Sequence, residues 1–217
     1  MVKRTLLYFL SFILVFSCSK KEESKKISGH STDTVEKVNR STELIPEPDI
    51  IERLKYQKTE IDSLISKKEL SLEVYAKIIG EEKTVLVKNE DWPENMETTF
   101  NIWKDRDGEI LFIGEYPISE SGDWFIGYHH YFDESGKTFA FERITSFFNS
   151  SCTERAANEI ITDFYNKDFN RIDRIYLLKD ENGQNLKKEE CVFNYDYPYE
   201  VLGTLNKYLI KTQILSK

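Results

Sequence analysis

The side chains best suited to chemistry in this 217-residue chain are few, and several lie in one aromatic stretch. His129 and His130 are two of only three histidines, and they are adjacent in a segment that is typical of a β-strand. Neighbouring strand residues point to opposite faces, so the two imidazoles cannot bind one metal ion together without a bulge. We therefore expect one buried, hydrogen-bonded histidine and one surface histidine, with no metal site and no catalytic role assigned.

The same stretch is crowded with aromatic rings. Strand alternation places Trp124, Tyr128 and His130 on one face. It places His129 and Tyr131 on the other. One face is expected to be core; the other either contacts a sugar or protein through rings with polar ends, or is covered by helices. The candidate binding surface comprises Trp124, Tyr128, His129, His130 and Tyr131.

Catalytic signatures with a fixed spacing are absent from the sequence. It contains no Gly-x-Ser-x-Gly, His-Glu-x-x-His or Cys-x-x-Cys. Residues 136–138 (Gly-Lys-Thr) copy the end of a phosphate loop, but Tyr131 stands where the first glycine is needed. Residues 105–108 suggest a calcium loop, yet that alignment puts Trp103 and Gly114 at ligand positions, so a tight turn is favoured. We predict no cofactor and favour a non-enzymatic protein.

Paired carboxylates remain as an alternative, because a glycosidase needs only two acids at a set separation and leaves no local motif. Residues 49–217 contain 32 acidic and 22 basic side chains, too many acids to nominate a pair. A cleft with two facing carboxylates beside Trp124 would favour this hydrolase, and a flat sheet would favour binding. The net charge of these residues is −10, which argues against nucleic acid. An acidic surface suits a basic or metal-rich partner, but most acidic surfaces only keep a protein soluble.

Residues 1–17 have the composition of an export signal. Lys3 and Arg4 precede an apolar run over residues 5–17. A helix of that length rises roughly 20 Å, short of the hydrocarbon core of about 30 Å, so a cleaved signal peptide is favoured over an uncleaved anchor.

The end of this run, residues 15–18 (Val-Phe-Ser-Cys), resembles the lipobox of bacterial lipoproteins. The resemblance implies that Cys18 carries lipid, becomes the first mature residue and anchors the protein in the membrane of the cell envelope. Ser19 is similar to the residue found in lipoproteins sent to an outer membrane. The charged run at residues 20–23 resembles an export tag of surface lipoproteins, so the periplasmic and surface faces both stay open.

Cys152 and Cys191 are the two remaining cysteines. An exported chain meets an oxidising compartment, so a disulfide between them is favoured over two buried free thiols. It would close a loop of about 40 residues and stabilise the fold by on the order of 4 kcal/mol. A reactive Cys152 at a helix N-terminus lacks an identifiable histidine partner.

The elements that position these residues follow from periodicity. Residues 18–48 are polar, with six basic and six acidic side chains, and are predicted to be a flexible tether. Asp49 with Glu52 predicts a capped helix start, followed by an apolar stripe that suits packing on a sheet or on a partner helix. Strands follow. Asp-x-x-Gly sequences at 105–108, 133–136 and 180–183 predict three β-hairpins.

Two further helices complete the expected order of helix, six strands, helix, two strands and helix. Ser151 with Glu154 resembles a capping box before an apolar stripe. Pro198 precedes a C-terminal amphipathic helix that is expected to end near Gln213. The predicted fold class is α+β, an antiparallel β-meander with about three helices on one face in a single domain at 49–217; a β-sandwich is the alternative.

The sequence as a whole predicts a lipid-anchored envelope protein of the binding or scaffold type, or an inhibitor or immunity module. The expected partners are the membrane, through the anchor, and an envelope protein or glycan. A carboxylate-pair hydrolase of the envelope is the alternative.

Overall fold

The computed structural model describes residues 49–193, 195 and 197–214. The expected signal peptide, Cys18 and tether lie outside these residues. The described residues belong to one compact unit. Among the described residues, no helix has both the length and the apolar content to cross a membrane.

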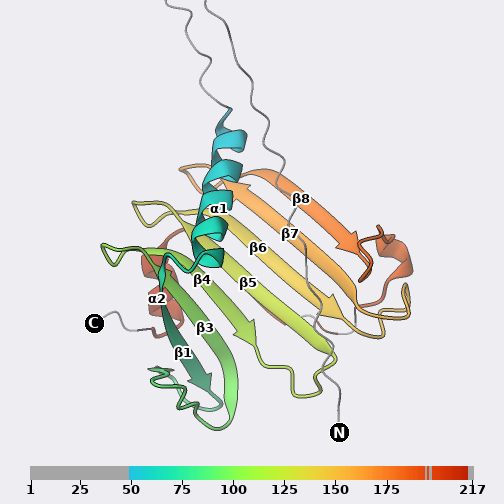
Figure 1. Cartoon of the computed structure of the whole chain (residues 1–217), viewed down its shortest axis with the longest axis horizontal. Helices are drawn as coiled ribbons and strands as arrows, with labels where there is room; N and C mark the ends of the chain where they lie inside the picture. Colours follow the sequence, from blue (N-terminus) through green and yellow to red (C-terminus); the bar gives the residue numbers. More distant parts are fainter. Residues whose placement is uncertain (1–48, 194, 196, 215–217) are drawn as a thin grey trace, which may run out of the picture. The chain divides into compact units, whose positions relative to one another are not determined.

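One antiparallel sheet of eight strands dominates the fold, in the order β2-β1-β3-β4-β5-β6-β7-β8 (Figure 1). The strands are β1 (Ser71–Ile78), β2 (Thr84–Leu86), β3 (Met96–Lys104), β4 (Ile110–Pro117), β5 (Trp124–Phe132), β6 (Thr138–Phe147), β7 (Ala157–Tyr165) and β8 (Arg171–Lys179). From β3 to β8 each strand pairs with the next strand in the chain, whereas β1 lies between β2 and β3. The predicted antiparallel meander is therefore confirmed.

Two α-helices accompany the sheet, α1 (Ile50–Ser66) and α2 (Leu205–Lys211), with a short 3-10 helix at Lys188–Glu190. The broad α+β class is confirmed, but two α-helices are described rather than about three. As predicted, Asp49 caps α1, its side chain accepting a hydrogen bond from the Ile51 amide.

The prediction of a helix after Ser151 is wrong, because the apolar residues there belong to strand β7. Alternation along β7 places Ala157 and Ile161 on one face, and Ile160 and Phe164 on the other. β7 lies between β6 and β8 and has buried residues on both faces, so its apolar positions do not alternate with polar ones. Its apolar residues happen to be three or four positions apart, which is the same spacing as in the apolar stripe of an amphipathic helix.

The three predicted turns have one design. In each, the Asp side chain accepts hydrogen bonds from the amides two and four residues on, and the glycine has a positive φ. The turns at 105–108 and 133–136 join β3 to β4 and β5 to β6. The turn at 180–183 leads from β8 into a short bridge. A fourth turn, between β7 and β8, repeats the hydrogen bonds with Asn166 and places Phe169 at φ 62°.

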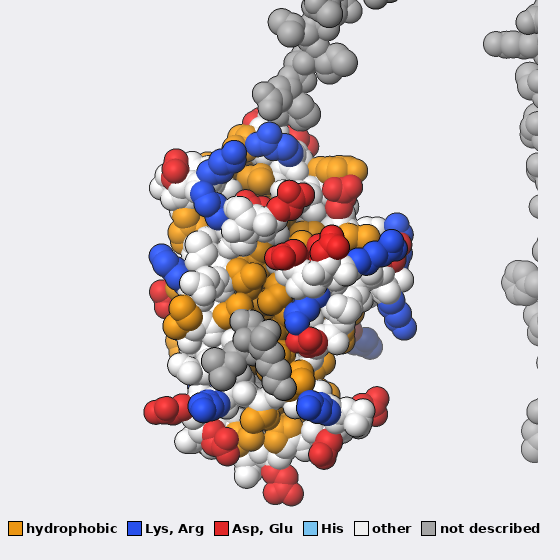
Figure 2. Space-filling view, turned by 90° about the vertical axis from the view of Figure 1, so that its left-hand side faces the viewer, with side chains coloured by type: hydrophobic (Ala, Val, Ile, Leu, Met, Phe, Trp, Pro, Cys, Tyr) orange, Lys and Arg blue, Asp and Glu red, His pale blue; other side chains and the backbone are white. Residues whose placement is uncertain are grey.

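The helices cover opposite faces of the sheet, which corrects the expectation that all pack on one face. Leu54 and Ile61 of α1 pack on one face of the sheet, which we call the α1 face. The described residues between 191 and 214, including α2, cover the other, the C-terminal face, where Tyr208 and Ile214 enter the core. Figure 1 shows α1 in front of the sheet and α2 behind it. On the side drawn in Figure 2, charged side chains of both signs surround a band of hydrophobic ones.

Candidate functional site

A cleft of about 860 Å³ lies on the C-terminal face. Strands β1, β3 and β4 line one side, and residues 197–213 line the other. Its volume lies within the range of sites that bind small molecules. The charged residues lining the cleft are Lys77, Glu81, Glu82, Glu97, Glu115, Glu200 and Lys211.

The chain that walls the cleft is held on the sheet by backbone carbonyls. Tyr128 donates its hydroxyl hydrogen to the carbonyl oxygen of Tyr197 at 2.6 Å. Thr138 donates to the carbonyl oxygen of Leu202, also at 2.6 Å. These bonds come from the sheet and satisfy carbonyls that belong to no strand, so they fix an irregular segment in place.

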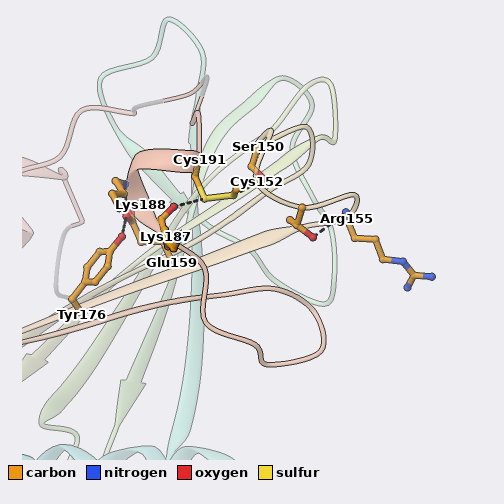
Figure 3. Close-up of a disulfide and its surroundings, with 9 residues drawn as sticks. Ser150, Cys152, Arg155, Glu159, Tyr176, Lys187, Lys188 and Cys191 are labelled. Carbon is orange, nitrogen blue, oxygen red and sulfur yellow. Dashed lines mark hydrogen bonds and ion pairs between the residues drawn. A yellow bond between two sulfur atoms is a disulfide. The ribbon is translucent and has the colours of Figure 1, made fainter.

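A disulfide fixes the start of the same segment. Cys152 and Cys191 are bonded, as predicted, with their Cα atoms 4.7 Å apart (Figure 3). The bond joins the loop before β7 to the chain after the 3-10 helix, so Cys152 lies in a loop and not at a helix N-terminus. Beside it the Val192 amide donates to the carbonyl oxygen of Ser150 at 2.7 Å. Nearby, the buried carboxylate of Glu159 is bonded by side chains of Lys188 and Tyr176.

Among the acidic side chains of the cleft, Glu115 is more buried than Glu97 and Glu200. The Tyr208 hydroxyl donates to Glu115 Oε2 at 2.7 Å. Burial raises the pKa of Glu115, although the Tyr208 hydrogen bond and the nearby Lys211 and Lys77 act in the opposite direction. Burial, followed by the charge of Glu115, also raises the pKa of Tyr208 well above its usual value.

His130 lies behind this pair and is buried. Its Nε2 is 3.9 Å from Glu115 Oε2, and its ring packs on Tyr208 with centroids 4.5 Å apart. Burial, with the nearby His129 and Lys211, lowers the pKa of His130 to about 3, so the ring is neutral at pH 7. Among the described residues, His130 Nδ1 has no hydrogen-bond partner.

Glu97 is a second, partly buried acid that lines the cleft. Lys77 Nζ lies 3.2 Å from Glu97 Oε2, which neutralises its charge. The Tyr197 hydroxyl lies 3.3 Å from Glu97 Oε1 and donates to it. Burial and the Glu97 charge raise the pKa of Tyr197, so its phenol stays protonated at pH 7.

A second hollow of about 470 Å³ adjoins the cleft, because both are lined by Glu97 and Tyr197. Trp124 lines it between two tyrosines, its ring centroid 5.8 Å from that of Tyr195 and 6.4 Å from that of Tyr197. We call the cleft and this hollow together the groove. It combines aromatic rings with carboxylates, so it is suited to ligands that have both an apolar face and polar groups.

The α1 face holds a separate polar network. His129 Nδ1 lies 3.4 Å from Glu142 Oε1, and its Nε2 lies 3.2 Å from the Tyr116 hydroxyl. Lys58 of α1 lies 3.1 Å from Glu142 Oε2. Burial alone would raise the pKa of Glu142, but hydrogen bonds from His129, Thr162 and Lys58 and the Lys58 charge lower it to about 2.

The structure therefore divides the candidate binding surface. Trp124 lines the groove, Tyr128 positions Tyr197, and His130 lies behind Glu115. His129 and Tyr131 lie on the α1 face, where Tyr131 donates to Asp62 at 2.8 Å. This division follows the alternation that the sequence predicted for β5.

Sequence reasoning missed most of the groove. Among the groove residues that it did not nominate are Glu97, Glu115, Tyr195, Tyr197 and Tyr208. One signal was available: residues 195, 197 and 199 are all tyrosine, the alternation of an extended segment with one aromatic side. Nothing local marks Glu115, since its partner Tyr208 is 93 residues away in the chain.

The described residues include no group of three His, Cys, Asp or Glu side chains placed to hold a metal ion. Comparison with known proteins gives no match to this chain among family models, curated proteins or solved structures.

Proposed function

We propose that this is a lipid-anchored protein of the cell envelope that binds a ligand in the groove without transforming it. The lipobox at residues 15–18 supports the anchor. The observation that carries the binding function is the groove itself, two adjoining hollows of about 860 and 470 Å³ with an aromatic wall.

Glu97 and Glu115 line the cleft and Trp124 lines the adjoining hollow, which is part of what a hydrolase was expected to show. The partners that these carboxylates already have favour binding instead. Glu97 is already bonded by Lys77 and Tyr197, and Glu115 by Tyr208. The groove is thus a preformed set of donors and acceptors, which lowers the cost of ordering side chains when a ligand binds.

A hydrolase with two carboxylates is the second candidate. Glu97 and Glu115 line one cleft, and the raised pKa of Glu115 suits a general acid. Product analysis separates the two functions: a binding protein returns its ligand unchanged, whereas a hydrolase releases shorter products.

The anchor is tested in cells with Cys18→Ser in the full-length chain. We expect the native chain in the membrane fraction, labelled by radioactive palmitate, and the variant unlabelled and released from membranes. Ser17→Ala is the matched control, since it keeps a small residue before the cysteine. A native chain without label, or a variant that stays in membranes, would refute the anchor.

The binding function is tested by blocking the cleft. Thr98 lines it and is 4% exposed, so Thr98→Trp should fill it. Saturation-transfer NMR with soluble fragments of the cell's own envelope should give ligand signals with the native protein and lose them with this variant. Thr99→Trp, one residue on and facing the opposite side of β3, is the control, and circular dichroism verifies both folds. Equal signals from all three proteins would contradict a ligand site in the cleft.

A further inference from the structure

We infer that the ligand of the groove is an uncharged oligosaccharide chain that stacks on Trp124 and its flanking tyrosines. This inference rests on the proposed binding function and names the class of ligand for that site. It is argued from the aromatic wall, the polar groups that face it, the charge of the lining and the extent of the groove.

The aromatic wall has open ring surface. Trp124 is only half-buried, Tyr195 is 38% exposed, and both line the smaller hollow. Tyr199 lies at the larger cleft and is 43% exposed. A sugar ring has an apolar face of C–H groups and an edge of hydroxyls, so it matches a ring surface bordered by polar groups.

The polar groups near this wall suit hydroxyls. Glu97 lies where the two hollows meet, with Glu120 in the smaller one and Glu115 in the larger. Carboxylate oxygens accept charge-assisted hydrogen bonds from hydroxyls. Lys77 and the Tyr197 hydroxyl supply donors beside Glu97, so both roles of a sugar hydroxyl can be met at one place.

The charge of the lining excludes acidic glycans. The described lining holds six glutamates, residues 81, 82, 97, 115, 120 and 200, against two lysines. Both lysines are already paired with groove carboxylates, Lys77 with Glu97 at 3.2 Å and Lys211 with Glu200 at 2.8 Å. A uronate or phosphate on the ligand would meet net negative charge and be repelled.

The extent of the groove favours a chain over a single sugar. Each hollow alone has a volume typical of a small-molecule site, and the two meet at Glu97 and Tyr197. A ligand that fills both must pass the Tyr197–Glu97 hydrogen bond, where its own hydroxyls can exchange with the phenol.

The experiment measures affinity by isothermal titration calorimetry on the full-length protein in a detergent that contains no sugar. The uncharged probes are cello- and chito-oligosaccharides of increasing length. Oligogalacturonate is the acidic probe and oligolysine the basic one. We expect the uncharged chains to bind, more tightly as they lengthen, and oligogalacturonate not to bind.

Variants assign the binding to the wall. Trp124→Ala and Tyr195→Ala should each weaken oligosaccharide binding at least tenfold, with Trp124→Phe retaining most of it if Trp124→Ala folds poorly. Trp92→Ala is the matched control, because Trp92 is 48% exposed and does not line the groove. It should leave the affinity unchanged.

The outcomes separate this inference from the proposed function. If no uncharged chain binds, or if Trp124→Ala and Tyr195→Ala both leave its affinity unchanged, the inference is overturned. Binding of oligolysine or oligogalacturonate in place of the uncharged chains also overturns it. The proposed function survives each of these results if Thr98→Trp still abolishes binding of envelope fragments, and falls with the inference if it does not.

Discussion

Glu142 joins α1 to the sheet through a single carboxylate. Lys58 approaches it from the helix, while His129 and Thr162 approach from β5 and β7. Because Glu142 Oε1 orients the Nδ1–H of His129, the other ring nitrogen is left to accept from Tyr116. The α1 face is thus held by polar bonds as well as by the packing of Leu54 and Ile61.

Replacing Glu142 with Gln is expected to lower the free energy of unfolding at pH 7 by on the order of 3 kcal/mol, because Lys58 loses a buried partner. The pKa of Glu142 is about 2 in the folded protein, below its ordinary value of 4.5. Its stabilisation is therefore complete above pH 4.5 and is lost as the pH falls toward 2. Urea unfolding at pH 7 and at pH 2.5 should show the gap between native and variant closing.

The matched control for this change is Glu134→Gln, in the exposed turn between β5 and β6. It should change stability by no more than about 0.5 kcal/mol at either pH. A Glu142→Gln protein as stable as this control at pH 7 would mean that the network contributes nothing to stability.

At the residue scale, the position of a side chain could be predicted from the sequence only where it depends on residues close by in the chain. The opposite faces of His129 and His130 follow from adjacency alone, and the structure has them so. Glu115 and Glu97 could not be distinguished from the other acidic residues, because their partners Tyr208 and Tyr197 lie 93 and 100 residues further along the chain. No local sequence pattern indicates a contact between residues so far apart in the chain.

At the scale of elements, the segment over residues 191–204 determines the groove. Its described residues belong to no strand, so the disulfide, an isolated bridge between Lys137 and Thr204 and hydrogen bonds to its carbonyls hold it. Its shape was not predictable, because irregular backbone carries no period. The hairpins were predictable at 105–108 and 133–136, where Asp and Gly have direct roles in the turn. The turn ending at Phe169 was not, since it uses Asn and a non-glycine residue.

The double change Cys152→Ser with Cys191→Ser is expected to free this segment. In the chain-entropy model, opening the loop lowers stability by about 4 kcal/mol. Hydrogen exchange followed by mass spectrometry should show residues 191–204 exchanging faster than in the native protein. The β3–β4 hairpin, far from the disulfide in sequence, is the internal control. Unchanged exchange at 191–204 would show that Tyr128 and Thr138 hold the segment without the disulfide.

At the scale of the whole molecule, the sequence divides into parts of different charge. The net charge of −8 combines a basic predicted signal, a neutral predicted tether and a charge of −10 over residues 49–217. The antiparallel architecture was predictable because its strands pair along the chain, so short repeating signals were enough. The placement of helices on both faces was not, because an apolar stripe does not say which side of a sheet it will cover.

Limited trypsin digestion tests this division. The predicted tether offers sites up to Arg40, and the next basic residue is Arg53 in α1. Cleavage is expected first in the tether, leaving a resistant fragment that mass spectrometry identifies as starting at Ser41. Equally early cleavage after Arg53 would contradict a tether that ends where α1 begins.

The chain-neighbour pairing of the strands has a mechanical consequence. If a lipid-held N-terminus and a ligand in the groove were pulled apart, α1 would detach and the sheet would open from β1. Each strand would be peeled from its neighbour a few hydrogen bonds at a time, which takes less force than shearing a whole ladder at once. The Cys152–Cys191 bond limits this process, because it encloses β7 and β8 in a covalent loop that tension on the chain ends cannot extend.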